Sequence, residues 1–235
     1  MIDIHSHLLP NVDDGVHTFT DSLAILRGYS EQGITDIIIT PHYIAETEWT
    51  SKRYQNQRIF AKLKDQAVAA KIPINIYLGN EIYIDPNVAE LLKSCTISSL
   101  ADSKYLLLEL PMSGEYAGAD DIFLSLIQAG YKVILAHPER YQSSHKNIDH
   151  LLELHEMGVL FQCNLGSIIG QYGKNTQKTL KKLAKADLIF CFGTDIHHTR
   201  DYSEIAKAQK KLRKYYSADR LQAVLETNAR KILCS

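Results

Sequence analysis

The chain has 235 residues, of which 45% are hydrophobic and 23% charged, and this composition is typical of a globular protein and too apolar for a disordered one. Its 26 basic and 27 acidic side chains leave a formal net charge of −1, so no overall field favours binding to nucleic acid or to an anionic membrane. No repeat and no Pro-, Gly- or Ser-rich linker divides the sequence, so we expect one domain over residues 1–235.

Short β-rich runs alternate with longer amphipathic stretches along the whole chain, as in parallel strands joined by helical crossovers. Strands are expected at residues 2–5, 36–40, 74–78, 105–108, 132–136, 159–163 and 188–192. Helices are expected at residues 20–32, 52–70, 87–92, 119–129, 147–157, 175–185, 203–215 and 218–233. A doubly wound nucleotide-binding sheet is disfavoured because no G-x-G-x-x-G or P-loop occurs. The pattern therefore predicts an α/β barrel of seven strands, close to the (β/α)8 type.

The apolar runs are strand-sized and far shorter than the roughly 20 residues needed to cross a bilayer. No basic leader and no long apolar run follows Met1, which argues against a secretory signal. We therefore expect a cytoplasmic protein without membrane insertion. The four scattered cysteines form no C-x-x-C and are expected to be reduced thiols.

Metal-ligand residue types follow six of the seven expected strands. They are His5 and His7 after the first, His42 after the second, Glu81 after the third, Glu109 after the fourth, His137 after the fifth, and Asp195 and His197 after the seventh. The sixth strand ends instead at Cys163 and Asn164. Because the carboxyl ends of barrel strands meet on one face, these side chains are expected in one site.

The ligand types also indicate which metals suit the site. Alternate residues of a strand share a face, so His5 and His7 can bind one ion together. Imidazoles mixed with carboxylates suit Zn, Mn or Fe and are too rich in nitrogen for Ca. So many ligands imply more than one ion, and Glu81 could bridge two ions about 3.5–4 Å apart, the arrangement that activates water and holds a phosphoryl group.

A series of motifs in fixed order resembles one known superfamily. The motifs are Ile2-Asp3-Ile4-His5-Ser6-His7, Asp13-Asp14-Gly15, Thr40-Pro41-His42, Gly79-Asn80-Glu81-Ile82, Glu109, Ala136-His137-Pro138-Glu139-Arg140 and Thr194-Asp195-Ile196-His197. Together they resemble the PHP (polymerase and histidinol phosphatase) superfamily, and most of all its bacterial manganese-dependent protein-tyrosine phosphatases associated with capsule and exopolysaccharide genes. The resemblance implies a (β/α)7 distorted TIM-like barrel with a trinuclear metal centre at its carboxyl face. His198 departs from the pattern, since similar sequences often have Asn there.

The resemblance also implies roles for individual residues. It places His5, His7, Glu81 and Asp195 around one ion, Glu81, Glu109 and His137 around a second, and Asp14, His42 and His197 around a third. The choice of Asp14 over Asp13 depends on the family pattern alone. Arg140 matches a phosphate-binding arginine, and Arg200 corresponds to a second one. The implied cofactors are two to three divalent ions, Mn first, with Fe or Zn as alternatives.

The resulting hypothesis is a metal-dependent protein-tyrosine phosphatase with Glu81, Arg140 and Arg200 as catalytic residues. A metal-held hydroxide would attack phosphorus near neutral pH, and a phenolate with a pKa near 10 leaves more readily than an alkoxide. No cysteine is followed by Arg six positions later, so the thiolate phosphatase signature is absent. The resemblance implies a substrate on a bacterial tyrosine kinase of polysaccharide export.

Other interpretations stay open from the sequence alone. The same centre would suit a small phosphoester such as histidinol phosphate, a phosphodiester, or a catalytically silent metal-binding module. Arg140 could instead form a plain surface ion pair. Tyr43, Tyr83 and Tyr141 lie beside the expected site loops and either line a pocket or pack in the core. Structural roles are expected for the histidines outside the motifs, which are His17, His145, His150 and His155.

Overall fold

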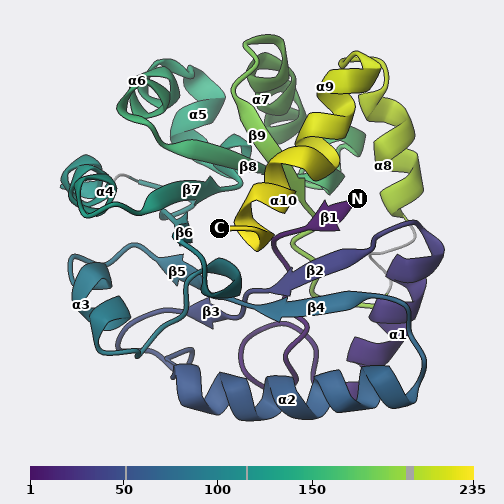
Figure 1. Cartoon of the computed structure of the whole chain (residues 1–235). Helices are drawn as coiled ribbons and strands as arrows, with labels where there is room; N and C mark the ends of the chain where they lie inside the picture. Colours follow the sequence, from purple (N-terminus) through teal and green to yellow (C-terminus); the bar gives the residue numbers. More distant parts are fainter. Residues whose placement is uncertain (51, 115, 200–203) are drawn as a thin grey trace.

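The computed structural model describes residues 1–50, 52–114, 116–199 and 204–235. The strands are β1 (Ile2–Asp3), β2 (Asp36–Ile39), β3 (His42–Tyr43), β4 (Asn75–Leu78), β5 (Glu81–Tyr83), β6 (Tyr105–Glu109), β7 (Lys132–Ala136), β8 (Leu160–Asn164) and β9 (Ile189–Gly193). Each pairs in parallel with its neighbours. Figure 1 shows these strands around a common centre, with most of the helices on the outside.

The strands form two sheets that continue into each other. The orders are β1-β2-β4 and β3-β5-β6-β7-β8-β9. Two of the strands continue beyond their expected ends after a break, one at Thr40 and Pro41 between β2 and β3, the other at Gly79 and Asn80 between β4 and β5. Because β2 pairs with β4 and β3 pairs with β5, each interrupted strand belongs to both sheets.

The two ends of this series are also joined by backbone hydrogen bonds. The Asp195 N–H donates to the His5 carbonyl at 2.9 Å, and the His7 N–H donates to the Ile196 carbonyl at 3.0 Å. Ser6 and Ile196 form a parallel bridge. Within the described residues the strand order is therefore that of a seven-stranded parallel barrel, which confirms the predicted fold class.

The helices mostly lie where the sequence pattern predicts them. They are α1 (Phe19–Glu31), α2 (Arg53–Ala69), α3 (Val88–Lys93), α4 (Ala119–Gln128), α5 (Gln142–Lys146), α6 (Asp149–Met157), α7 (Lys174–Lys185), α8 (Ile205–Leu212), α9 (Ala218–Gln222) and α10 (Asn228–Leu233). A π-helical turn over Ala223–Thr227 joins α9 and α10, so the helix expected at 218–233 is one irregular unit. The helix expected at 203–215 is shorter, and α5 was not predicted.

Apolar side chains pack in two buried clusters, one inside the barrel and one between the strands and the helices. Leu107 of β6 and Ile134 of β7 belong to the inner cluster, whereas Leu106 and Leu108 of β6 belong to the outer one. Side chains alternate along a strand, so Glu109 shares the inward side with Leu107. The alternation thus directs a carboxylate into the carboxyl end of the barrel.

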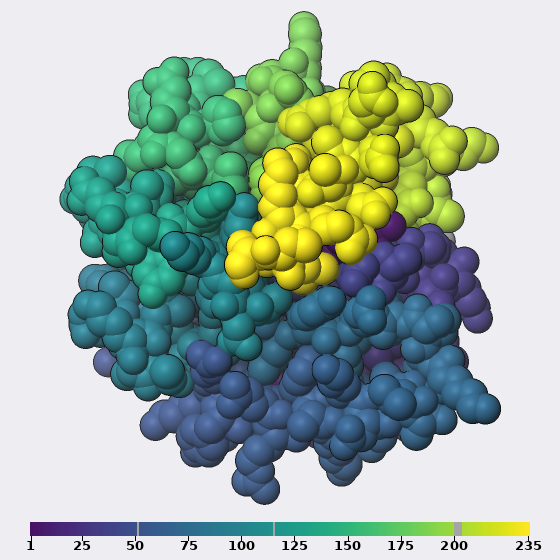
Figure 2. Space-filling model, viewed as in Figure 1, coloured from purple at the N-terminus to yellow at the C-terminus, as the bar shows by residue number. Residues whose placement is uncertain are grey.

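Helix α10 covers the opposite, amino-terminal end of the barrel. Its Ala229 and Ile232 are fully buried in the inner cluster, and its Arg230 reaches Asp36 at the start of β2, with 3.5 Å between Nη2 and Oδ2. Figure 2 shows the C-terminal residues in yellow across the centre of this face. The functional residues are therefore reached from the other face.

Two further sequence expectations concern the membrane and the cysteines. Among the described residues, none of the helices is both long and apolar enough for a bilayer crossing. The four cysteines are free, with Cys163 and Cys191 buried and Cys95 and Cys234 exposed.

Candidate metal centre

Four side chains from distant strand ends converge where the barrel closes. The Nε2 atoms of His5 and His7 lie 3.2 Å apart, and Glu81 Oε2 lies 3.1 Å from the first and 3.2 Å from the second. Asp195 Oδ1 lies 3.4 Å from each of these nitrogens. All four residues are buried. This is the first group that the resemblance implies, and one ligand atom from each residue lies within 4.8 Å of the others.

A second group shares Glu81 with the first. His137 Nε2 lies 2.9 Å from Glu81 Oε1 and 3.7 Å from Glu109 Oε1. His42 Nδ1 lies 3.1 Å from Glu81 Oε2 and 3.8 Å from Glu109 Oε2. The two oxygens of Glu81 thus face different imidazoles, as a bridging carboxylate requires. The ligand atoms of His42, Glu81 and Glu109 lie within 4.8 Å of one another. The geometry therefore adds His42 to the second group expected from the sequence, whereas His137 contacts that group through Glu81 Oε1 and is not among its clustered ligand atoms.

A third group lies at the rim. Asp14 Oδ1 lies 3.3 Å from His197 Nε2 and 3.5 Å from His42 Nε2. The His7 ring stacks on the His197 ring with 4.0 Å between centroids. The two nitrogens of His42 therefore face different groups, Nδ1 the second and Nε2 the third.

Asp13 and Asp14 are neighbours with different environments. Asp13 Oδ2 accepts from His7 Nδ1 at 2.8 Å and from the His42 N–H at 2.9 Å, and its side chain is fully buried. Burial raises the pKa of Asp13, but the charge and hydrogen bond of His7 outweigh it and lower the pKa to about 2. The Asp14 side chain is 43% exposed and faces the third group. The geometry supports Asp14 as the ligand and Asp13 as the residue that orients His7.

Two site residues have a left-handed backbone conformation, and a glycine allows a strand to approach a third. His137 and Asp195 have φ angles of 34° and 56°, in a region uncommon for residues other than glycine. His137 follows β7 directly, and Asp195 comes two residues after the end of β9. At the end of β9, a Cβ on Gly193 would lie 2.8 Å from Cβ of His5, so only glycine lets β9 approach that histidine.

The carboxylates of the site repel one another. Burial and then the nearby Glu81 and Asp195 raise the pKa of Glu109 to about 9. Burial also opposes ionisation of Glu81, but the charges of His5 and His42 hold its pKa well below the usual range. The buried Glu81 Oε2 and His42 Nδ1 have no hydrogen-bond partner. Divalent cations would satisfy these atoms and relieve the repulsion, so the donor set fits metal ions.

Strand β8 supplies a support that the sequence reasoning missed. The carboxylate of Asp195 can only accept, so Asn164 Nδ2 donates to Asp195 Oδ2 at 2.7 Å. Asn164 Oδ1 then accepts from Gln162 Nε2 at 2.9 Å, and Gln162 Oε1 accepts from His5 Nδ1 at 2.7 Å. This chain leaves the lone pair of His5 Nε2 for a metal. Amides are not usual ligands, but residues 162 and 164 do share one strand face, a signal that the sequence offered.

Arg140 reaches the site from the 3₁₀ turn at Pro138–Arg140 that follows β7. Its Nη1 donates to Asp195 Oδ2 at 2.6 Å, and its guanidinium lies over the Tyr172 ring, 4.5 Å from the centroid. With 25% of its side chain exposed, it remains open to a ligand at the rim. The alternative of a plain surface ion pair is therefore disfavoured. Arg200 lies outside the described residues.

Three of the other residues considered have structural partners. Tyr141 is buried, donates from its hydroxyl to the Ala136 carbonyl at 2.7 Å and accepts from the Leu110 N–H at 3.1 Å, which favours packing. His150 Nε2 lies 3.0 Å from the exposed Asp120 carboxylate. His145 Nε2 lies 3.1 Å from the Glu139 carbonyl. Neither histidine belongs to a ligand group among the described residues.

The family model for capsular polysaccharide synthesis, CpsB/CapC, matches residues 1–234. The chain belongs to the CpsB/CapC family. This confirms the resemblance to the capsule-associated phosphatases. A putative tyrosine-protein phosphatase CapC of Staphylococcus aureus is 32% identical over 92% of this chain and 86% of its own. Tyrosine-protein phosphatase YwqE of Bacillus subtilis is 33% identical over 85% of this chain and 78% of its own.

Solved structures of CpsB/CapC proteins share the whole fold. One match, from crystal structures of YwqE of Bacillus subtilis and CpsB of Streptococcus pneumoniae described as unique metal-dependent tyrosine phosphatases, has a TM-score of 0.93 and 31% identity and covers 100% of this chain and 94% of that one. A D-hydantoinase matches with a TM-score of 0.59 and 11% identity over 98% of this chain and 70% of its own. At that identity the hydantoinase shows a common fold and no more.

Proposed function

We propose that this CpsB/CapC protein is a metal-dependent protein-tyrosine phosphatase. The observation that carries the proposal is the three overlapping ligand groups, joined through Glu81, His7 and His42, beside an arginine at the rim. The relatives named as tyrosine phosphatases support the same activity. We assign the metal ligands as His5, His7, Asp14, His42, Glu81, Glu109, His137, Asp195 and His197.

The bound cofactors are proposed to be two to three divalent ions, Mn first. When bound, such ions supply an activated water near neutral pH and contacts that withdraw charge from the phosphoryl oxygens. Mn takes mixed imidazole and carboxylate ligands, and Fe or Zn would also suit them. Glu81 holds two ligand groups at a fixed separation, because its buried carboxylate faces both.

Arg140 is proposed to bind the phosphoryl group. A guanidinium offers five N–H donors in a planar fork that matches phosphate oxygens. One of its nitrogens donates to Asp195 Oδ2, so other donors remain for substrate. Tyr172 beneath the guanidinium keeps it at the rim. The phenolate product has a pKa near 10, so its departure requires little help from a proton donor.

The substrate is proposed to be phosphotyrosine on a bacterial tyrosine kinase that regulates capsular or exopolysaccharide synthesis, in the cytoplasm, with residues 1–235 acting as one domain. Kinetics on purified protein test the activity. We expect Mn-dependent release of phosphate from a phosphotyrosine peptide, loss of the rate after chelation, and much slower turnover of a phosphoserine peptide and of histidinol phosphate.

Two outcomes would contradict the proposal. Faster turnover of histidinol phosphate than of the phosphotyrosine peptide would indicate a small-molecule phosphatase. Full activity after exhaustive chelation, with the absence of metal verified by elemental analysis, would exclude the metal centre from catalysis.

A further inference from the structure

A cavity of about 720 Å³ lies beside the metal centre, and none of its lining residues belongs to the ligand groups. One wall comes from the loop that follows β1, including Pro10 and Val12, and the other from α2, including Asn56 and Ile59. The cavity is wide enough for several residues of a peptide, and it lies outside the volume in which the metal ligands meet.

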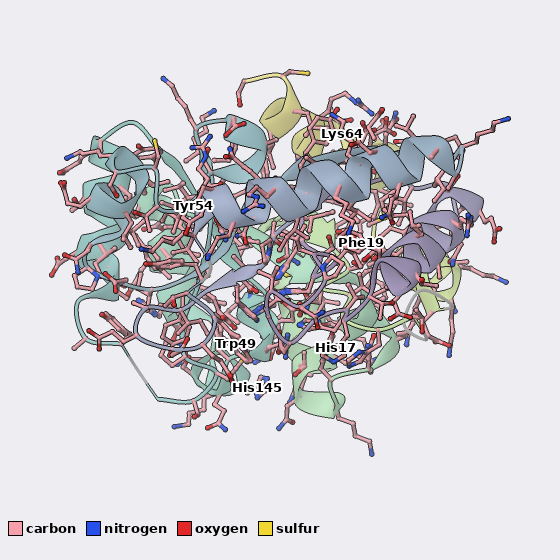
Figure 3. All side chains as sticks on the ribbon, turned by 90° about the horizontal axis from the view of Figure 1, so that it is seen from below. His17, Phe19, Trp49, Tyr54, Lys64 and His145 are labelled. Carbon is pink, nitrogen blue, oxygen red and sulfur yellow. The ribbon has the colours of Figure 1, made fainter. Side chains whose placement is uncertain are left out.

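The cavity adjoins the metal centre along two segments. Val12 precedes the pair Asp13 and Asp14 directly. Glu48 and Thr50 line the cavity on either side of Trp49, whose ring stacks on the ligand His42 with 5.4 Å between centroids and 12° between planes. Figure 3 shows Trp49 and His17 on the side of the molecule away from α10. Two segments thus connect the cavity wall to residues of the metal centre.

Asn56 gives the cavity a specific polar group. It is 1% exposed, and neither its Nδ2 nor its Oδ1 has a hydrogen-bond partner. Buried donors and acceptors without partners cost free energy and are rare in folded proteins. One carboxamide offers a donor and an acceptor together, which matches the C=O and N–H of a polypeptide backbone. The unpartnered pair therefore points to a peptide rather than to a simple anion.

The charge on the cavity wall indicates which peptide it suits. Arg58 and Lys62 lie one turn apart on α2, and both line the cavity. In the part of the chain that the structure describes, neither forms an ion pair with a carboxylate, and Lys62 Nζ lies over the Phe19 ring, 4.7 Å from its centroid. Glu48 is the acidic residue of the wall. The balance is positive and complements acidic side chains.

We propose that this cavity is a specificity subsite for the acidic polypeptide segment that adjoins phosphotyrosine in the substrate protein. The inference rests on the proposed phosphatase function and adds to it the class of sequence that the enzyme prefers. Asn56 pairs with the backbone of that segment, and Arg58 and Lys62 attract its Asp or Glu side chains. The metal centre and Arg140 act on the phosphoryl group itself.

The test compares two phosphotyrosine peptides of equal length. One carries Asp and Glu beside the phosphotyrosine, and the other carries Asn and Gln in the same places. The measured quantity is the ratio of kcat/KM for the acidic peptide to that for the neutral one. We expect a ratio well above one in the wild type, a fall of about 5- to 30-fold in the double variant Arg58→Glu, Lys62→Glu, and a weaker preference at high salt.

Lys64→Glu is the matched control. It reverses one charge on the same helix, and Figure 3 shows Lys64 on the side of α2 toward α10. This variant is expected to keep the wild-type ratio. A second probe is Asn56→Leu, which keeps the approximate volume and removes the amide. It is expected to raise KM for both peptides with little change in kcat and no loss of thermal stability, because no hydrogen bond is lost within the protein.

Failure of this inference and failure of the proposed function give different results. No turnover of either peptide by the Mn-loaded wild type would overturn the phosphatase proposal. Turnover of both with a ratio near one, or a ratio that Lys64→Glu lowers as much as the double variant does, would overturn the subsite alone. An unchanged KM in Asn56→Leu would exclude backbone pairing by Asn56.

Discussion

Residues that are not metal ligands themselves also contribute to this site, by orienting the ligands. Gln162 and Asn164 carry no charge, yet they link His5 to Asp195 through a continuous chain of hydrogen bonds. Groups that orient a metal-binding histidine fix its tautomer and ring position. The residues that support the metal ligands are therefore as open to test as the ligands.

Glu81→Ala and Arg140→Ala are expected to fail in different ways. Loss of Glu81 removes the carboxylate shared by two ligand groups, so metal content and turnover should both collapse. Loss of Arg140 removes the hydrogen-bond donors proposed to bind the phosphoryl group. It should lower kcat about 100- to 1,000-fold, with metal content close to normal. Elemental analysis and steady-state kinetics on the same preparations provide the comparison. Normal metal content in Glu81→Ala would contradict the assignment of this ligand.

Gln162→Ala is expected to weaken metal binding or activity about 10- to 100-fold, as losses of such supporting partners do. The physical reason is that His5 Nδ1 loses its hydrogen-bond acceptor, so the tautomer that leaves Nε2 free for a metal is no longer fixed. Metal titration monitored by restored activity measures the effect. Gln57→Ala, an exposed change on α2, serves as the control and should match the wild type; an unaltered titration in Gln162→Ala would show that the amide is dispensable.

Most strands and helices lie where the local sequence pattern predicts them. The sequence pattern does not predict β3 and β5, because the expected strands end at residues 40 and 78, before Pro41 and Gly79. The helix α5 was missed because its five residues are too few for a helical period to be recognised. Both short strands nevertheless carry site residues, since β3 begins with His42 and β5 begins with Glu81.

The covering helix α10 contributes to stability at the end of the barrel remote from the site. Ile232 is fully buried there, so Ile232→Ala is expected to lower the free energy of unfolding by about 2–5 kcal/mol. Urea unfolding of the metal-loaded protein measures the change. Val68→Ala, at a residue that is 71% exposed, should stay within about 0.5 kcal/mol of the wild type. Equal effects of the two changes would show that α10 does not seal the barrel core.

For the whole molecule, the site connects segments that lie far apart in the chain. Ligand candidates follow β1, β7 and β9 and lie within β3, β5 and β6. Ions bound to them would tie the barrel together across its carboxyl end. Because the unfolded chain lacks these groups of ligands, binding favours the folded state.

Metal removal is therefore expected to lower thermal stability. A ligand present at 1,000 times its Kd stabilises the folded state by about 4 kcal/mol, so chelation should reduce Tm by several degrees and added Mn should restore it. Differential scanning calorimetry with and without a chelator measures the shift. The same experiment on Glu81→Ala should show little dependence on Mn; an equal shift in wild type and variant would place the stabilising ion elsewhere.

The alternation of strands and helices, the parallel barrel and the metal-ligand types at the strand ends all follow from the sequence alone. These features depend on hydrophobic periodicity, end signals and residue chemistry, all of which are local. The folded chain shows further that His42 faces two ligand groups, that Asp13 contacts His7 while Asp14 faces the rim, and that Gln162 holds His5 across a separation of 157 residues. Such contacts depend on how distant segments meet, and no local period encodes that.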